Sequence, residues 1–419
     1  MSSHHAADSS ARPGFDARLT IDVAHERRLT TGVAHSAHFN SAGSSLPSHA
    51  VVQTVVGHLR REEELGGYEA ANEVRPRIES VYDSAAQLIG ARRHEIALFD
   101  SASTGLRVLL DALRLSSVQR IVASTSTYVS HALHLMSIAR ENGVELVIAP
   151  ADATRRVDLA ALDALLSDGK PTVLTVAHVP TSSGLVEPVV EIGVIAGRYN
   201  ATYILDATQS VGQLESDVSA IGCHVLVTTG RKFLRAPRGT GFAYVSEELC
   251  RTLLPLAPDV RGAHWTSLMD WDLDASARRF ESWEAYIAGR LGLGTAIDEA
   301  IGRGIRETDL WMRKTGAVVR ESLESITGVT IVDPEGADSA IITFAIDGVK
   351  PADAVRGLAE RGLRVVSVPA THGQWDLGDR GVSSVIRASA HVYNDDADLA
   401  LLAEGVGEIA AGKLAGSAA

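Results

Sequence analysis

Three short segments carry the residues that could do chemistry in this chain of 419 residues. Small hydroxyl residues fill 100–105 at the start of an expected helix, where backbone amides and the helix dipole favour a phosphate or where the helix is simply capped. Asp206 ends a wholly apolar stretch, and a carboxylate there needs a cationic partner because an unpaired buried charge is unfavourable. The loop 228–241 holds four basic residues and three glycines, which indicates an anion site more than a solvated loop.

In this order, the three segments resemble the pyridoxal-phosphate enzymes of fold type I, in particular the class V aminotransferase and cysteine desulfurase superfamily. Here Asp206-Ala207-Thr208-Gln209 is followed by Thr229-Gly230-Arg231-Lys232. Asp206 and Lys232 are 26 positions apart, which matches the family's spacing between a strand-borne Asp and the lysine that binds the cofactor. The resemblance covers most of the chain.

The resemblance implies that pyridoxal 5'-phosphate is the cofactor and that Lys232 holds it as a Schiff base. Asp206 would pair with the pyridinium nitrogen and keep the ring able to accept electrons, so Lys232 and Asp206 are the expected catalytic residues. The remaining cofactor contacts it implies are Gln209 at the phenolic oxygen, Tyr128 stacked on the ring, Thr181 in a stretch that follows a strand, and Ser103, Thr104, Thr229 and Arg231 at the phosphate. Tyr128 alone could be a helix-capping surface residue, and His178 is either a cofactor contact or a buried structural histidine.

Two further segments resemble the family's substrate site. Val385 to Asn394 matches the element V-R-I-S-x-x-x-Y-N, in which the Arg, here Arg387, grips the substrate carboxylate with both prongs of its guanidinium. A surface Arg on an edge strand is the alternative. Near the N-terminus, Asn40, Ala42 and Gly43 fall in a stretch that resembles D-N-A-x-T, which lines the carboxylate pocket and folds with the small domain.

Departures from the family pattern reduce the number of reactions that we expect the protein to catalyse. A desulfurase that forms a persulfide needs a Cys on a loop before the carboxylate Arg, and 368–375 contains none. Residues 62–71, 180–184 and 279–281 are similar to the C-S lyases that finish ergothioneine assembly and to actinobacterial enzymes that process cysteine S-conjugates in natural-product pathways, including those of lincosamides. We therefore expect β-elimination from an S-conjugated L-cysteine, with release of thiol, pyruvate and ammonia. Decarboxylation-coupled oxidative deamination, epimerisation and transamination remain alternatives, as does a binding module without catalysis.

The composition is typical of a soluble globular protein. Hydrophobic residues make up 45% of the chain, and the net charge of −13 makes it a poor generic binder of nucleic acid or anionic membrane. Only two cysteines occur, Cys223 and Cys250, without the ligand spacing of a zinc site, so we expect two structural thiols, no metal and a cytoplasmic location. We find no apolar run long enough to span a membrane.

The pattern of apolar runs predicts the elements that position these residues. Seven short runs between residues 95 and 245 alternate with amphipathic helices, which indicates a mainly parallel seven-stranded α/β sheet covered on both faces. A long helix at Glu307 to Leu323, four strand-like runs and two more helices follow, and these predict a small α+β C-terminal domain. We expect a flexible arm at 1–37, a large cofactor-binding domain at 38–300 with 38–47 packing toward the small domain, and the small domain at 301–419. The fold type further implies a homodimer with shared active sites, to which Gly66-Gly67-Tyr68 and Trp265-Thr266 could contribute from the second subunit.

Overall fold

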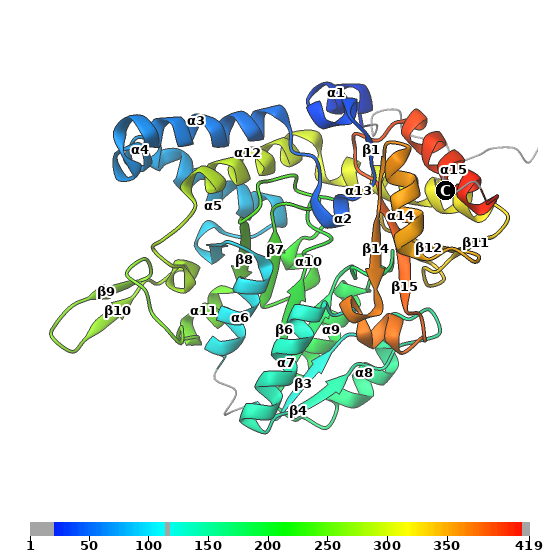
Figure 1. Ribbon diagram of the computed structural model, residues 1–419. Helices are drawn as coiled ribbons and strands as arrows, with labels where there is room; N and C mark the ends of the chain where they lie inside the picture. The colour runs from blue at the N-terminus through cyan, green and yellow to red at the C-terminus, as the bar shows by residue number, and fades with distance from the viewer. Residues whose placement is uncertain (1–20, 114–117, 413–419) are drawn as a thin grey trace, which may run out of the picture.

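A mainly parallel sheet of seven strands forms the centre of the large domain (Figure 1). The computed structural model describes residues 21–113 and 118–412. The strand order is β2-β8-β7-β6-β5-β3-β4, and β8 pairs antiparallel with both of its neighbours. The seven predicted strands are therefore confirmed, with bounds β2 Ile96–Phe99, β3 Arg120–Ala123, β4 Glu145–Ile148, β5 Thr172–Ala177, β6 Thr202–Asp206, β7 Val225–Thr229 and β8 Gly241–Val245.

Helices cover both faces of this sheet because its strands are apolar on both sides. Along β6, Tyr203 and Leu205 belong to one hydrophobic cluster and Ile204 to another, so successive side chains enter opposite cores. The first cluster takes in α5 Arg75–Ile89, α8 Leu159–Leu166, α9 Val189–Arg198, α10 Val218–Ile221 and α12 Ile287–Arg303. The second takes in α6 Ala102–Ala112, α7 Val129–Asn142 and α11 Glu247–Thr252. A further helix, α3 His49–Leu65, runs along α12 at the top of Figure 1, and the short helix α4 Gly67–Glu73 packs against α3.

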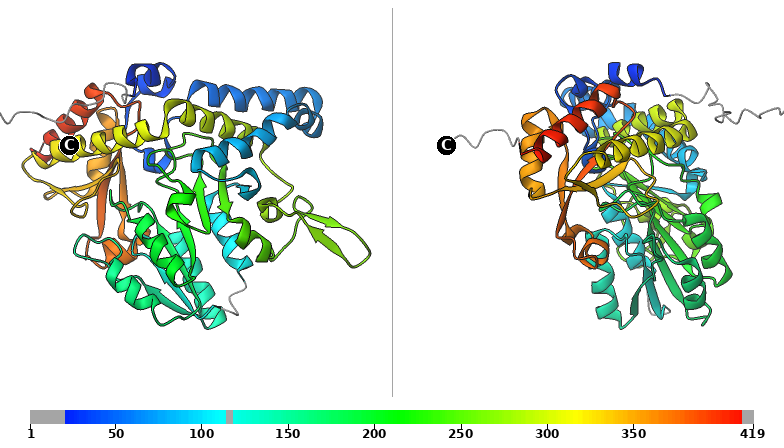
Figure 2. Two further views of the ribbon diagram at one scale, coloured as in Figure 1. Left: turned by 180° about the vertical axis from the view of Figure 1, so that it is seen from behind. Right: turned by 90° about the vertical axis from the view of Figure 1, so that its right-hand side faces the viewer.

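The small domain is a four-stranded sheet backed by helices, as the second view in Figure 2 shows from the side. Its strand order is β11-β12-β15-β14, and all of its neighbours are antiparallel. Its elements are α13 Ile305–Glu324, β11 Val329–Ile331, β12 Ile341–Ile346, α14 Pro351–Glu360, β13 Leu363–Arg364, β14 Val366–Pro369, β15 Ser384–Ser389 and α15 Asp396–Ala410. One predicted strand is wrong in detail, since the run Leu363 to Val368 divides. β13 pairs with the N-terminal strand β1 Ala37–His38, and β14 pairs with β15.

The N-terminal segment differs from the expected flexible arm over residues 21–37. Helix α1 Val23–Arg28 carries a buried Glu26, which pairs with Arg235 at 2.7 Å and with Arg303 at 2.7 Å. Burial opposes its ionisation, but the two guanidinium groups outweigh burial and lower the pKa of Glu26. After β1, the short helix α2 Ser41–Ser44 and the bridge from Asn40 to Ser389 lie against the small domain. The first twenty residues of the arm lie outside the described residues.

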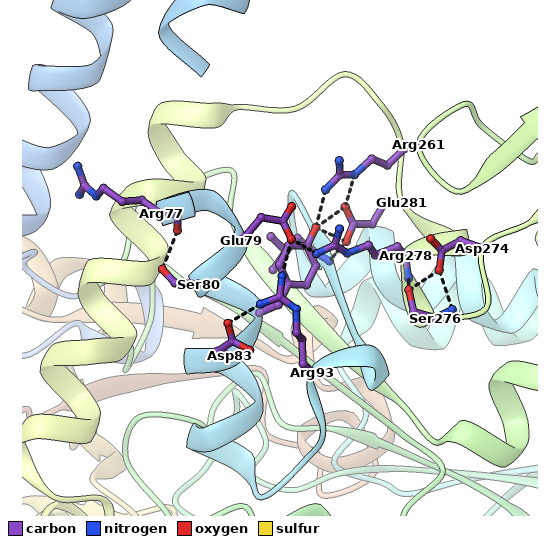
Figure 3. A network of polar contacts seen from close by, with 12 residues as sticks. Arg77, Glu79, Ser80, Asp83, Arg93, Arg261, Asp274, Ser276, Arg278 and Glu281 are labelled. Carbon is purple, nitrogen blue, oxygen red and sulfur yellow. Dashed lines mark hydrogen bonds and ion pairs between the residues drawn. The ribbon is translucent and has the colours of Figure 1, made fainter. Parts of the chain in front are cut away.

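A β-hairpin that the sequence did not predict projects from the large domain at the left of Figure 1. It comprises β9 Ala263–Trp265 and β10 Trp271–Leu273, paired antiparallel. Figure 3 shows a polar network in which the buried carboxylate of Glu281 accepts a hydrogen bond from Arg261. The same carboxylate accepts a hydrogen bond from the Tyr82 hydroxyl at 2.8 Å. Arg278 lies 4.1 Å over the ring of Tyr82, so both ends of the hairpin are fixed to α5. None of the helices in the described ranges is long and apolar enough to cross a membrane.

Candidate active site

A cavity of about 420 Å³ opens where the carboxyl ends of the large-domain strands face the small domain. Ligands bind at this edge of open parallel sheets because loops and helix N-termini converge there. Most of the predicted site residues line it, namely Ala42, Gly43, Ser103, Tyr128, Thr181, Asp206, Thr229, Arg231, Lys232 and Arg387. Residues more than 340 positions apart in the chain thus meet in one cavity.

The loop that carries Lys232 is held tightly on both sides. Gly230 lies so close to its neighbours that a Cβ would be 2.4 Å from the Thr240 hydroxyl oxygen. Arg235 adopts a left-handed backbone with φ of 61°, a conformation unfavourable for a residue with a side chain. Its guanidinium stabilises this conformation through Glu26 and through the carbonyl of Leu46 at 2.9 Å. The N-terminal segment therefore positions the lysine loop.

Lys232 and Asp206 form the buried centre of the cavity. Burial first, and then the nearby Arg231, lower the pKa of Lys232 to about 7, while Asp206 opposes this shift. An amine with such a pKa is substantially neutral near pH 7, which is the form that attacks an aldehyde or removes a proton. The carboxylate of Asp206 ends β6 and accepts a hydrogen bond from the amide of Thr208 at 3.0 Å. The Lys232 Nζ lies 5.9 Å from the centre of the Tyr128 ring.

The residues present fit pyridoxal phosphate. Thr208 Oγ1, Gln209 Oε1 and Arg387 Nε are buried without hydrogen-bond partners, although buried polar atoms are almost always paired. A polar ligand in the cavity would supply such partners. Ser103, in the first turn of α6, and Thr229, at the end of β7, offer hydroxyl and amide groups of the kind that bind phosphate at a helix N-terminus.

The small domain contributes Arg387 to the lining of the cavity. It lies on β15, is 4% exposed, and donates to Thr181 Oγ1 at 2.7 Å, to the Thr181 carbonyl at 3.0 Å and to Asn40 Oδ1 at 3.3 Å. No carboxylate of the described residues pairs with it. Burial, assisted by Arg231, lowers the pKa of Arg387 to about 10, so the group is still charged at neutral pH. A buried guanidinium without an acidic partner is suited to bind a carboxylate from outside.

Three predicted site residues lie just behind the cavity lining. Asn40 reaches it only through Arg387, and Gln209 donates from Nε2 to the carbonyl of Ala42 at 3.1 Å. The hydroxyl of Thr104 lies 3.1 Å from that of Ser101, and Ser101 caps the helix by accepting a hydrogen bond from the Thr104 amide. His178 is also behind the lining; burial lowers its pKa to about 3, so it stays neutral.

Some residues of the cavity were not singled out from the sequence. Arg238 lines its entrance from the basic loop, and Ser367 and His372 line it from the small domain. The basic composition of 228–241 was the signal for Arg238. His372 carries no motif, and only the return of the chain through β14 and β15 brings it to the cavity. Gly67 and Tyr68 line a different cavity, beside α3 and α5.

The comparisons with known proteins agree with the fold described above. A probable cysteine desulfurase from Methanothermobacter thermautotrophicus is 29% identical over 82% of this chain and 86% of its own. A probable hercynylcysteine sulfoxide lyase from Mycobacterium tuberculosis is 26% identical over 95% and 96%. The apo cysteine desulfurase from Thermococcus onnurineus superposes with a TM-score of 0.85 at 23% identity, over 94% of this chain and 98% of the other. Since the family model for class V aminotransferases matches residues 37–402, the chain belongs to this family of pyridoxal-phosphate-dependent enzymes.

Proposed function

We propose that the protein is a C-S lyase that removes the thiol from an S-substituted L-cysteine and releases pyruvate and ammonia. The observation that carries the proposal is the joint presence of Lys232 and Arg387 in a cavity whose described lining holds no cysteine. Cys223 and Cys250 are both buried in the large domain's hydrophobic clusters, and burial raises the pKa of each thiol. Neither is placed to accept sulfur from a substrate, which favours release of a thiol over persulfide transfer.

The site residues have separable tasks in this reaction. Bound pyridoxal phosphate supplies an electron sink for the bond broken at the substrate Cα. Ser103 and Thr229 would hold its phosphate, and Asp206 would hold its ring nitrogen protonated. Arg387 binds the substrate carboxylate through two parallel hydrogen bonds and thereby fixes the Cα. Lys232, once free, takes the Cα proton, and its lowered pKa keeps it available as a base near neutral pH.

The relatives support a cysteine-derived substrate. The names of the desulfurase and of the hercynylcysteine sulfoxide lyase denote action on cysteine or a cysteine conjugate, and the matches cover 82% and 95% of this chain. We propose the S-conjugate class and do not extend it to hercynylcysteine, since the similarity to that lyase is no greater than to the desulfurases.

We also propose that the enzyme works as a homodimer. The tip of the β9–β10 hairpin exposes Leu268 at 85%, Met269 at 83% and Trp265 at 80%, which is unfavourable for apolar side chains in water. A second copy would cover these side chains. Light scattering on the wild type and on a variant with Trp265→Ser and Met269→Ser tests this: we expect a dimer and a weakened dimer respectively, and a monomeric wild type would refute it.

The test of the lyase reaction is turnover of S-methyl-L-cysteine, with pyruvate and methanethiol measured separately. The wild type should release both in equal amounts. The Lys232→Ala variant should release neither above background, because the base and the cofactor anchor are both removed. Equal rates in the two proteins would refute the assignment of Lys232, and carbon dioxide or an inverted amino acid from the wild type would point to another reaction at Cα.

A further inference from the structure

The imidazole of His372 lines the active-site cavity and has no role in the reaction as described above. His372 ends a short 3₁₀ helix, Ala370–His372, in the connection between β14 and β15. Its side chain is exposed, lines the same cavity as Lys232 and Arg387, and meets the ring of Tyr128 edge-on at 6.3 Å between centroids.

The connection that carries His372 is fixed to the large domain at several points. Gly373 packs so closely on Ser182 that an added Cβ would lie 2.9 Å from its hydroxyl oxygen. Ser182 also donates to Asp376 at 3.3 Å, and Arg155 pairs with Asp379 at 2.9 Å. Trp375 packs against the hydrophobic cluster under α6 and α7. Contacts with the large domain therefore set where His372 faces the cavity.

His372 and Lys232 lie near the same side chain of the cavity, Tyr128. The Tyr128 ring has Lys232 Nζ 5.9 Å from its centre and the His372 ring 6.3 Å from its centre, so it adjoins both groups. A substrate gripped by Arg387, with its Cα within reach of Lys232, carries Cβ one bond further and sulfur two bonds further. The sulfur leaves with a negative charge unless a side chain gives it a proton.

The other proton-carrying groups of the lining are less suited to this task. His131 is buried and bonded to the Thr175 hydroxyl at 2.8 Å, and burial lowers its pKa to about 3, so it carries no proton to give. Lys232 receives the Cα proton, and Asp206 would pair with the ring nitrogen of the cofactor. Asp100 follows β2 and is a carboxylate, a weaker acid-base match for a thiolate than an imidazolium. Tyr128 is assigned to the face of the ring, which leaves the imidazole of His372.

Building on the function proposed above, we propose that His372 is the catalytic acid that protonates the departing sulfur. Lys232 first takes the Cα proton, and the electron pair left at Cα then forms a Cα–Cβ double bond. The Cβ–S bond breaks with its electron pair on sulfur, and the proton on the His372 imidazolium forms the S–H bond of the neutral thiol. The exposed imidazole then regains a proton from solvent. Such an acid would let the enzyme cleave substrates that release alkyl thiols, because an alkyl thiolate is a poor leaving group unless it is protonated.

The test compares leaving groups in the cofactor-loaded enzyme. The variants are His372→Gln, which keeps a polar side chain but not the proton transfer, Tyr128→Phe, and Thr371→Ala as a control at the adjacent exposed residue. The substrates are S-methyl-L-cysteine and S-(4-nitrophenyl)-L-cysteine, whose thiolate leaves readily unprotonated. The exchange of the substrate Cα hydrogen with D₂O is followed by NMR in each protein, since it reports the step before sulfur departs.

For His372→Gln we expect kcat/KM to fall about 10²- to 10⁴-fold with the methyl substrate, the usual contribution of a general acid. It should fall less than about tenfold with the nitrophenyl substrate, and Cα exchange should be unchanged. Equal losses on both substrates, slower exchange, or leaving-group dependence in Tyr128→Phe instead would overturn the role of His372 while leaving the lyase function intact. A wild type that releases thiol from neither substrate would overturn both.

Discussion

Replacing Arg387 with Gln should damage substrate binding far more than folding. The structure shows why: Arg387 is buried with three neutral hydrogen-bond acceptors and no carboxylate. A fall in its pKa to about 10 corresponds to about 3 kcal/mol of unfavourable charge burial, because one pKa unit is worth about 1.4 kcal/mol. The three hydrogen bonds offset this by about 1 kcal/mol each. The net contribution of Arg387 to stability is therefore close to zero.

The same guanidinium should contribute strongly to the reaction. Two charge-assisted hydrogen bonds to a substrate carboxylate are worth about 3–5 kcal/mol together. At about 1.4 kcal/mol per factor of ten, Arg387→Gln should lower kcat/KM about 10²- to 10³-fold. Arg387→Lys keeps the positive charge but cannot form two parallel hydrogen bonds to a carboxylate, so we expect a loss of kcat/KM smaller than that of Arg387→Gln.

Urea unfolding of the three proteins and steady-state kinetics with S-methyl-L-cysteine provide the measurements. The free energy of unfolding of Arg387→Gln should lie within about 1 kcal/mol of the wild type. A loss of more than about 3 kcal/mol would mean that Arg387 is a structural ion-pair partner, as expected for a broken buried pair. An unchanged kcat/KM would mean that it does not bind the substrate carboxylate.

Three other substitutions test how the site is held. Glu26→Gln leaves Arg235 and Arg303 buried without an anion and should destabilise the protein by about 3–5 kcal/mol in urea unfolding; a change below about 1 kcal/mol would refute the role of this cluster. Burial raises the pKa of Glu187 to about 7, so the native state holds the extra proton and wild-type stability should fall as pH rises from about 5 to 8. Glu187→Gln should remove most of this fall, and an identical pH dependence of urea unfolding in both proteins would contradict it. Gly230→Ala forces a Cβ against Thr240 and should lower bound cofactor, measured by absorbance; full occupancy would show that the loop can move.

The sequence predicted the elements whose apolar pattern is local. The central strands of the large domain are short runs buried on both faces, such as Thr172–Ala177, and this pattern can be recognised in the sequence without knowledge of the neighbouring strands. The site motifs at Asp206 and Lys232 follow directly from such strands, so they too could be placed. The direct contacts expected of Asn40 and Gln209 stay predictions; in the structure these side chains touch the lining residues Arg387 and Ala42.

The features that the sequence did not reveal depend on partners far along the chain. Residues 21–37 show no sustained periodicity, and contacts with distant parts of the chain hold them, such as the ion pairs of Glu26 with Arg235 and Arg303 and of Arg27 with Asp398. The composition of the run at 363–368 shows no break. In the structure its first part, β13, pairs with β1, and its second part, β14, pairs with β15. The β9–β10 hairpin has exposed apolar residues that resemble no amphipathic pattern, and His372 reaches the site through the tertiary fold alone.

The most direct test of the proposed lyase is the fate of the substrate carbons. The wild-type enzyme with its cofactor is given S-methyl-L-cysteine labelled with ¹³C at the three cysteine carbons, and the products are identified by NMR. The proposal predicts that all three labelled carbons appear in pyruvate, with one methanethiol for each pyruvate. Labelled alanine would indicate desulfuration, and labelled carbon dioxide with an aldehyde would indicate decarboxylation; either result would contradict β-elimination.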